Sequence, residues 1–127
     1  MPIDHFSLED CDRPFAVHVR AVFVATQAAV KHMKAGGRII NIGSCHAERM
    51  PLAGGSVDAM RKAALVGVVK SLARALGPRG ITIHNVQPDP VDTDRNPATT
   101  DVAKTLLPQV MALPRDGTGD AIAAMVA

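Results

Sequence analysis

Three side chains suited to proton-transfer chemistry lie close in the sequence: the hydroxyl of Ser44, the carboxylate of Asp58 and the amine of Lys62. Asp58 and Lys62 are one helical turn apart, a spacing typical of an i,i+4 ion pair that contributes about 0.2–0.5 kcal/mol. A carboxyl group titrates near ~3.9, so Asp58 falls short as a general acid at neutral pH by roughly 4 kcal/mol, and a neighbouring lysine lowers its pKa further. Ser44 has no base beside it. We therefore predict an ion pair and a polar strand end rather than a catalytic group.

A second set of reactive side chains is the segment Cys45-His46-Ala47-Glu48, which holds a thiol, an imidazole and a carboxylate. Zinc sites usually show paired ligands at short spacing twice over, whereas here there is one cluster, which Cys11 or His18 would have to complete from elsewhere. A Cys–His nucleophile is also disfavoured, because neighbours in sequence seldom reach the geometry it needs. We interpret the segment as a polar loop and predict no metal site.

The elements that must position these residues begin with a long helix. Ser7 and Asp10 have the spacing of a capping box. Apolar residues then recur at helical spacing on two faces, so we expect this helix to be covered on both. Pro14 predicts a kink or a fresh start near Asp12, because it removes a backbone hydrogen bond at a cost of roughly 3 kcal/mol. Gly36-Gly37 ends the helix. The apolar residues are Phe15, Val19, Val22, Phe23, Val30 and Met33 on one face and Val17, Val24 and Ala28 on the other.

Two β-branched runs, 38–43 and 81–86, predict buried strands on either side of a second long helix over 56–76. Ser56 is its candidate cap, Gly77-Pro78 ends it, and weaker helices are expected near 100–111 and 120–127. The order helix, strand, helix, strand implies a right-handed parallel crossover in an α/β layer. Because parallel sheets are usually wider than two strands, the pattern indicates part of a sheet.

Composition narrows the class of protein. The chain has 127 residues, a formal net charge of +2, three Phe, no Trp and no Tyr, which suits one domain over 1–127 and argues against a nucleic-acid surface. The missing tyrosine excludes any mechanism that needs a phenol.

The longest apolar run, 21–30, is too short to span a bilayer, and no secretory signal or CxxC motif is visible. We expect a cytoplasmic chain with two reduced thiols and no membrane partner.

Four ordered segments resemble the short-chain dehydrogenase/reductase family: 36–44, 62–65, 76–82 and 88–93. The segment Ala47 to Pro51 is similar to the Ala-Glu-Arg-Met-Pro loop of one branch. The resemblance implies a partial Rossmann-like, doubly wound α/β fold with two parallel strands, two long helices and short C-terminal helices. It also implies NAD or NADP as cofactor, and transfer of hydride between nicotinamide and a carbonyl or alcohol.

The resemblance places this chain's residues at the family's special positions. Ser44 and Lys62 stand at the serine and lysine positions, Asp58 at the tyrosine position and His18 at the asparagine position, while Arg61 replaces a small residue. The catalytic set is therefore Ser44, Asp58 and Lys62, which we expect to be non-functional. Cofactor contacts are expected from Lys62, Pro88, Val91 and Thr93, although Asp89 replaces a glycine beside them. The glycine-rich phosphate-binding turn of the family is absent from the sequence.

These departures predict a degenerate, catalytically inactive fragment with weak or absent NAD(P) binding. The alternative is an interaction module that pairs with itself or with an intact relative through the two long helices. A third hypothesis is that a separate chain supplies the cofactor half and reconstitutes an enzyme; that partner would also have to supply the tyrosine.

Overall fold

A computed structural model describes residues 2–105 and 107–127, which form two compact units, one up to Gln87 and the other Pro88–Ala127. The first unit contains α1 (Leu8–Phe15), α2 (Ala21–Ala29), β1 (Arg38–Ile42), α3 (Ser56–Leu76) and β2 (Thr82–Val86). The second contains α4 (Asp101–Thr105), α5 (Leu107–Val110) and α6 (Gly119–Val126). The predicted α/β class is confirmed.

The first helical segment begins with the predicted capping box. Ser7 Oγ accepts the backbone N–H of Asp10 at 3.1 Å, and the Asp10 carboxylate accepts the backbone N–H of Ser7 at 3.0 Å. Pro14 lies in the last turn of α1 and is followed by a π-helical segment, Ala16–Arg20, in which the N–H of Ala21 reaches back to the carbonyl of Ala16. The irregularity predicted near Asp12 is therefore misplaced: α1 runs through Asp12, and the helix widens only after the proline, by one π-helical turn.

Only one face of this helical segment is covered. Thr26 is 6% exposed, whereas Val17 is 59% exposed and Val24 46% exposed, so the prediction of two covered faces is wrong. The helix also ends at Ala29, before the predicted glycines. Arg79 donates to the carbonyls of Val30 and Met33 at 2.5 and 3.3 Å and thereby satisfies acceptors at the end of the helix.

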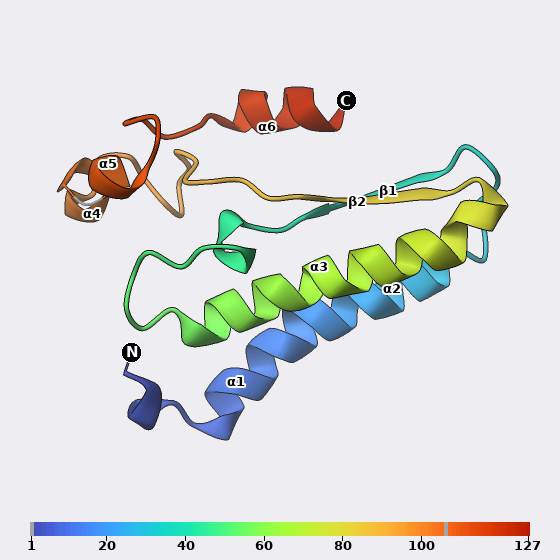
Figure 1. Ribbon diagram of the computed structural model, residues 1–127, viewed down its shortest axis with the longest axis horizontal. Helices are drawn as coiled ribbons and strands as arrows, with labels where there is room; N and C mark the ends of the chain where they lie inside the picture. Colours follow the sequence, from blue (N-terminus) through green and yellow to red (C-terminus); the bar gives the residue numbers. More distant parts are fainter. Residues whose placement is uncertain (1, 106) are drawn as a thin grey trace. The chain divides into compact units, whose positions relative to one another are not determined.

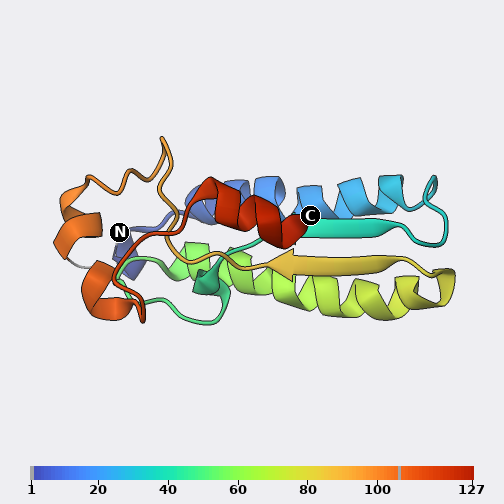
Figure 2. The same ribbon diagram turned by 90° about the horizontal axis from the view of Figure 1, so that it is seen from above.

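The two strands pair in parallel, with Arg38 opposite Thr82 and Ile42 opposite Val86. The helices α2 and α3 run along one face of this two-stranded sheet, as Figures 1 and 2 show. The core between helix and sheet is formed by side chains at helical spacing on α3 and by two isoleucines near β2: Leu65, Val69, Leu76, Ile81 and Ile83. The buried face of α3 thus follows from its apolar stripe. Its N-cap is Gly55 rather than the predicted Ser56, which is the first helical residue.

The turn between α3 and β2 depends on Gly80, whose φ of +68° lies in the left-handed region that glycine adopts without steric cost. Its N–H bonds to the carbonyl of Gly77 at 2.9 Å, and its own carbonyl accepts the N–H of Gly36 at 2.8 Å. The first bond closes the turn after α3, and the second joins the segment before β2 to the segment before β1.

The second unit is made of short helices and turns. Val91 forms a parallel bridge with Gly117, and α6 has Thr118 as its N-cap, whose hydroxyl accepts the N–H of Ala121 at 3.2 Å. The helix predicted near 100–111 is present as α4 and α5 among the described residues, and residue 106, between them, lies outside those residues. Among the helices that the structure describes, none is long and apolar enough to cross a membrane.

Candidate functional site

Ser44 lies two residues after the end of β1, in the loop that follows the strand. Its backbone is extended, and its hydroxyl accepts the backbone N–H of His46 at 3.2 Å, which starts the short 3₁₀ turn Cys45–Ala47. The hydroxyl proton of Ser44 is left to bond another group. The strand end therefore presents a polar side chain on a turn that the same side chain stabilises.

The residue before it, Gly43, allows a close approach between the two strands. A Cβ at this position would lie 2.7 Å from Oδ1 and 2.8 Å from Nδ2 of Asn85. The amide of Asn85 thus packs flat against the backbone of Gly43, and its Nδ2 donates to Gln87 Oε1 at 3.4 Å. Only glycine fits here without displacing that amide.

Lys62 reaches the same strand end from α3. Its ammonium donates to the carbonyl of Gly43, the residue before Ser44, at 3.1 Å. Burial lowers the pKa of Lys62, the positive charge of Arg61 lowers it further, and the negative charge of Asp58 only partly compensates. Lys62 is therefore a positioned cation at the carboxyl end of β1.

Asp58, in the first turn of α3, does not pair with Lys62. One carboxylate oxygen, Oδ2, lies 2.7 Å from Nδ1 of His46, and the other, Oδ1, accepts a hydrogen bond from Arg61. The predicted i,i+4 ion pair is thus replaced by an i,i+3 pair and by a contact with the turn after β1. Lys62 instead donates a hydrogen bond to the backbone carbonyl of Gly43.

The electrostatics of Asp58 follow from these contacts. Burial raises the pKa of the carboxyl group, but the hydrogen bond from His46 and the positive charges of Arg61 and Lys62 outweigh it, so the pKa lies below the ordinary value of 3.8. The carboxylate is ionised at neutral pH and has no proton to donate.

The other expected cofactor residues, Pro88, Val91 and Thr93, lie in the second unit. Val91 is held by its bridge to Gly117, and Thr93 Oγ1 accepts the backbone N–H of Asn96 at 3.1 Å. The structure thus gives Val91 and Thr93 roles in a loop of hydrogen-bonded turns. Ser44, Asp58 and Lys62 belong to the first unit, and each set is positioned by its own unit.

No metal site forms in the part of the chain that the structure describes: no group of three or more His, Cys, Asp or Glu side chains comes together there. Neither Cys11 nor Cys45 forms a disulfide bond within the described residues.

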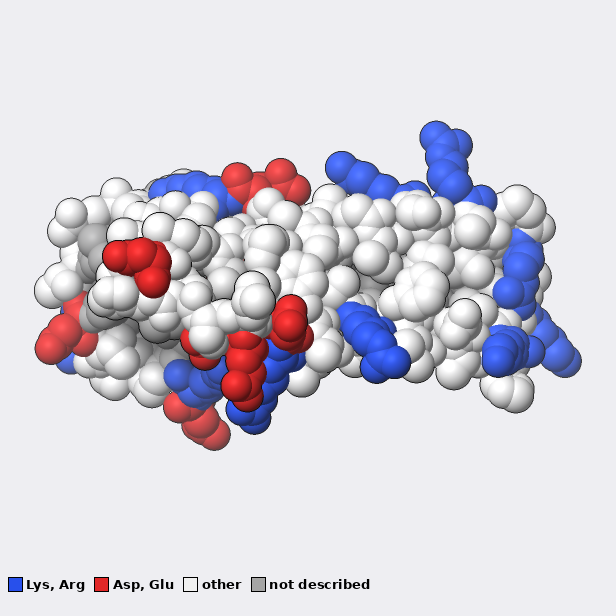
Figure 3. Space-filling model, turned by 90° about the horizontal axis from the view of Figure 1, so that it is seen from below, with Lys and Arg blue, Asp and Glu red and all other residues white. Residues whose placement is uncertain are grey.

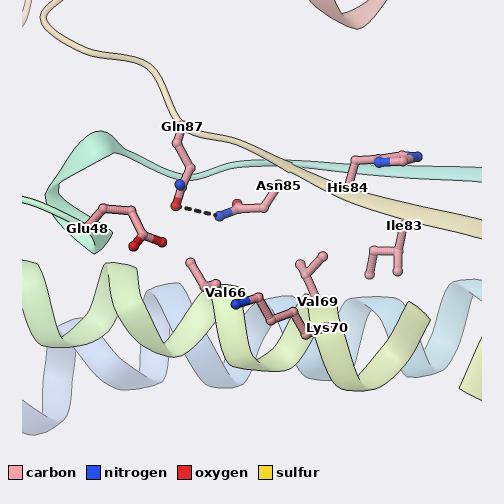
Figure 4. A pocket seen from close by; sticks show the side chains of 8 residues that line it. All are labelled: Glu48, Val66, Val69, Lys70, Ile83, His84, Asn85 and Gln87. Carbon is pink, nitrogen blue, oxygen red and sulfur yellow. Dashed lines mark hydrogen bonds between the residues drawn. The ribbon is translucent and has the colours of Figure 1, made fainter. Parts of the chain in front are cut away.

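A hollow of about 290 Å³ lies between α3 and the outer edge of β2. Figure 4 shows Asn85 and Gln87 above Val66 and Lys70 of α3, with Glu48 at one end. Apolar side chains share its lining with both a carboxylate and an amine. None of Ser44, Asp58 and Lys62 is among its lining residues, so this hollow is separate from the predicted catalytic positions.

Sequence reasoning missed the joint role of His46 and Arg61. His46 was interpreted as part of a polar loop, and Arg61 only as a departure from a small residue. The sequence signal that could have found this contact is a histidine four residues after the last residue of β1, followed by a carboxylate in the first turn of the next helix. A parallel crossover brings that turn back to the same end of the sheet.

Comparisons with known proteins were made over the whole chain. A family model described as Enoyl-(Acyl carrier protein) reductase matches residues 1–127. The Cyclic-di-GMP-binding biofilm dispersal mediator protein of Escherichia coli (strain K12) is 45% identical over 119 residues, which cover 94% of this chain and 50% of that protein.

Two solved structures resemble the whole chain closely. A short-chain dehydrogenase/reductase from Serratia marcescens BCRC 10948 has 52% sequence identity and a TM-score of 0.95, covering 99% of this chain and 51% of that one. A short chain dehydrogenase from Burkholderia cenocepacia J2315 in complex with NADP has 48% identity and a TM-score of 0.95, covering 100% and 51%. The chain therefore spans about half the length of these relatives.

Proposed function

Because this chain belongs to the short-chain dehydrogenase/reductase family, we propose that it retains the family's Rossmann-like scaffold, as part of one domain over 1–127, and has lost tyrosine-based hydride transfer. The observation that carries this proposal is the state of Asp58, at the tyrosine position. Both of its oxygens are engaged, by His46 and by Arg61, and its pKa lies below the ordinary value. A group that stays ionised at neutral pH cannot protonate a substrate oxygen as a phenol does.

The remaining family positions fit only part of a nicotinamide cofactor. An ammonium group has three donors, and Lys62 commits one of them to Gly43, which leaves others for a ribose hydroxyl. Thr93 already accepts a hydrogen bond from Asn96, and the exposed Asp89 places a negative charge on the loop where cofactor phosphates would approach. We accordingly expect Lys62, Pro88, Val91 and Thr93 to give weak or negligible binding of NAD or NADP.

The direct test is an assay of the purified chain with NADH or NADPH and a panel of aldehydes and ketones, followed by cofactor absorbance. We expect no oxidation of cofactor above the rate without protein, and no heat of cofactor binding in calorimetry at micromolar concentrations.

Two variants on the same helix sharpen this test. Lys62→Ala removes the amine at the family position, and Lys70→Ala removes an exposed amine farther along α3. Turnover that Lys62→Ala abolishes and Lys70→Ala preserves would overturn the proposal, as would tight cofactor binding with the same dependence.

A second candidate function is self-association, or pairing with an intact relative, through the long helices. The observation that favours it is exposed apolar surface on the helical segments: Val17 is 59% exposed, Phe23 47%, and Val24 and Met60 46% each. Clustered apolar side chains on helices are the usual anchors of such an interface.

The charge distribution favours an antiparallel pair of copies. Segments 13–47 and 59–88 contain no Asp or Glu, whereas Asp4, Glu9, Asp10 and Asp12 all precede them. In Figure 3 the surface over the C-terminal ends of the helices shows Lys and Arg without acidic residues. An antiparallel second copy would place the acidic start of one helical segment against the basic end of the other.

Light scattering over a series of protein and salt concentrations tests this candidate. We expect a dimer that Phe23→Ser and Val24→Asp disrupt, while Leu113→Ser, at a more exposed apolar position of the second unit, does not. A monomer under all conditions, or equal effects of the three substitutions, would exclude it.

A further inference from the structure

The contact between His46 and Asp58 has a feature that the loss of hydride transfer does not use. His46 lies in the turn after β1 and Asp58 in the first turn of α3, and Nδ1 and Oδ2 are 2.7 Å apart. Arg61, one turn farther along α3, bonds the other oxygen of the same carboxylate. The carboxylate is thus held at both ends and cannot turn away from the imidazole.

This arrangement fixes which nitrogen of the imidazole carries the proton. An ionised carboxylate only accepts hydrogen bonds, so a neutral His46 donates from Nδ1 to Asp58 and carries its lone pair on Nε2. Within the described residues Nε2 forms no hydrogen bond, and about a third of the side chain (32%) is exposed. A neutral, oriented imidazole with an open Nε2 is the form that accepts a proton from water or an alcohol.

Two side chains at the same end of the sheet as His46 have hydrogen-bond donors for an oxygen atom on which negative charge develops. Lys62 is an ammonium group at the same end of the sheet, with donors beyond the one that Gly43 takes, and its charge is close enough to lower the pKa of Asp58. The hydroxyl of Ser44 accepts from the backbone of His46 and so lies on the same turn, with its proton available to a further acceptor. Preorganised donors of this kind stabilise an oxyanion.

We infer that His46, positioned by Asp58 and Arg61, is a general base for the hydrolysis of small carboxylic esters. Nε2 takes a proton from a water molecule while the water oxygen bonds to the acyl carbon, and the electron pair of the carbonyl moves onto its oxygen beside Lys62. The electron pair on that oxygen then re-forms the carbonyl double bond, and the bond between the acyl carbon and the alcohol oxygen breaks. Nε2 gives its proton to the leaving alkoxide. Water and ester yield acid and alcohol, and no cofactor takes part.

The activity test uses the full chain and p-nitrophenyl acetate, with release of p-nitrophenolate as the readout. We expect His46→Gln to lower the rate above the buffer blank by at least about tenfold, given that positioned acid–base groups contribute about 10²–10⁴. His84→Gln is the matched control, because His84 is an exposed histidine of β2 that contacts no carboxylate among the described residues. Equal rates for the two variants would overturn the inference.

Asp58→Asn tests the positioning role with a readout that a purely structural role would not move. The amide can donate to Nδ1 as well as accept from it, so the proton is no longer confined to Nδ1, and we expect the rate to fall and its pH profile to change. An unchanged profile contradicts the inference.

Carbethoxylation of the wild-type chain by diethyl pyrocarbonate, read by mass spectrometry, gives an answer that does not depend on any variant folding. His46 should react several-fold faster than His5, His32 and His84, and equal reactivity overturns the inference. These readouts are independent of the hydride assay, so failure here leaves the proposed loss of hydride transfer standing, and the reverse also holds.

Discussion

Substitution of Gly43 by alanine tests the packing at the end of β1. A Cβ at this position would lie 2.7, 2.8 and 3.0 Å from Oδ1, Nδ2 and Cγ of the Asn85 amide, all shorter than an ordinary van der Waals contact. The backbone cannot easily retreat, because the Gly43 N–H donates to Val86 at 2.7 Å and its carbonyl accepts from Lys62 at 3.1 Å. Asn85 must therefore move, although its bond to Gln87 is already long at 3.4 Å.

Overpacking of this kind costs about 1–3 kcal/mol in the free energy of unfolding. For a domain of this size that corresponds to a fall in Tm of roughly 3–6 °C per kcal/mol. Urea and thermal unfolding followed by circular dichroism measure both quantities. The control is Gly67→Ala in α3, where a Cβ meets nothing within 4 Å and the change should stabilise the helix by about 0.5–1 kcal/mol.

The double variant Gly43→Ala/Asn85→Ala identifies the cause. Removing the amide should recover part of the loss, because the new methyl group then has room. If Gly43→Ala proves as stable as the wild type, or if truncation of Asn85 recovers nothing, the reasoning about this close approach is refuted.

Three further outcomes are expected from unfolding experiments. Leu65→Ala, at a side chain only 3% exposed, should lower the free energy of unfolding by about 2–5 kcal/mol, whereas Leu113→Ala, at a residue 63% exposed, should change it little. Ser7→Ala should cost about 0.5–2 kcal/mol, measured by urea unfolding, because the N–H of Asp10 loses its acceptor. Since the pKa of Asp58 is lowered in the folded state, its stabilising contribution is present at neutral pH and is lost as the pH falls below 3.8 through the folded-state value. In urea unfolding at successive pH values, Asp58→Asn should therefore lose less of its free energy of unfolding at acid pH than the wild type does. An equal loss in the two proteins would contradict the assignment.

The elements that were predictable are those whose signals are local. The capping box at Ser7, the strand at Arg38–Ile42 and the helix at Ser56–Leu76 follow from neighbouring residues, and the structure confirms them. The parallel crossover follows in turn from their order. These predictions hold because the spacing of apolar residues and the capping residues at helix ends are signals that extend over only one or two helical turns.

What could not be predicted depends on contacts between elements. Arg79 bonds to the carbonyl of Val30 at the end of the first helical segment, although the two residues are 49 positions apart in the chain. No local sequence pattern predicts this contact. The partner of Asp58 was misjudged for the same reason. Lys62 has the spacing of an i,i+4 partner for Asp58. In the structure its amine instead bonds to the carbonyl of Gly43, and His46 contacts the Asp58 carboxylate.

The widened turn at Ala16–Arg20 gives this helical segment room for a change in length. A π-helical turn holds one residue more than an α-helical turn, so a homologue that lacked one residue here would run through as regular α-helix and keep the position of Thr26 on the buried face. The loss of one residue outside this turn would instead rotate the buried position by about 100° around the helix axis. Single-residue deletions among the relatives should therefore be found at this turn rather than in the α-helical stretches on either side.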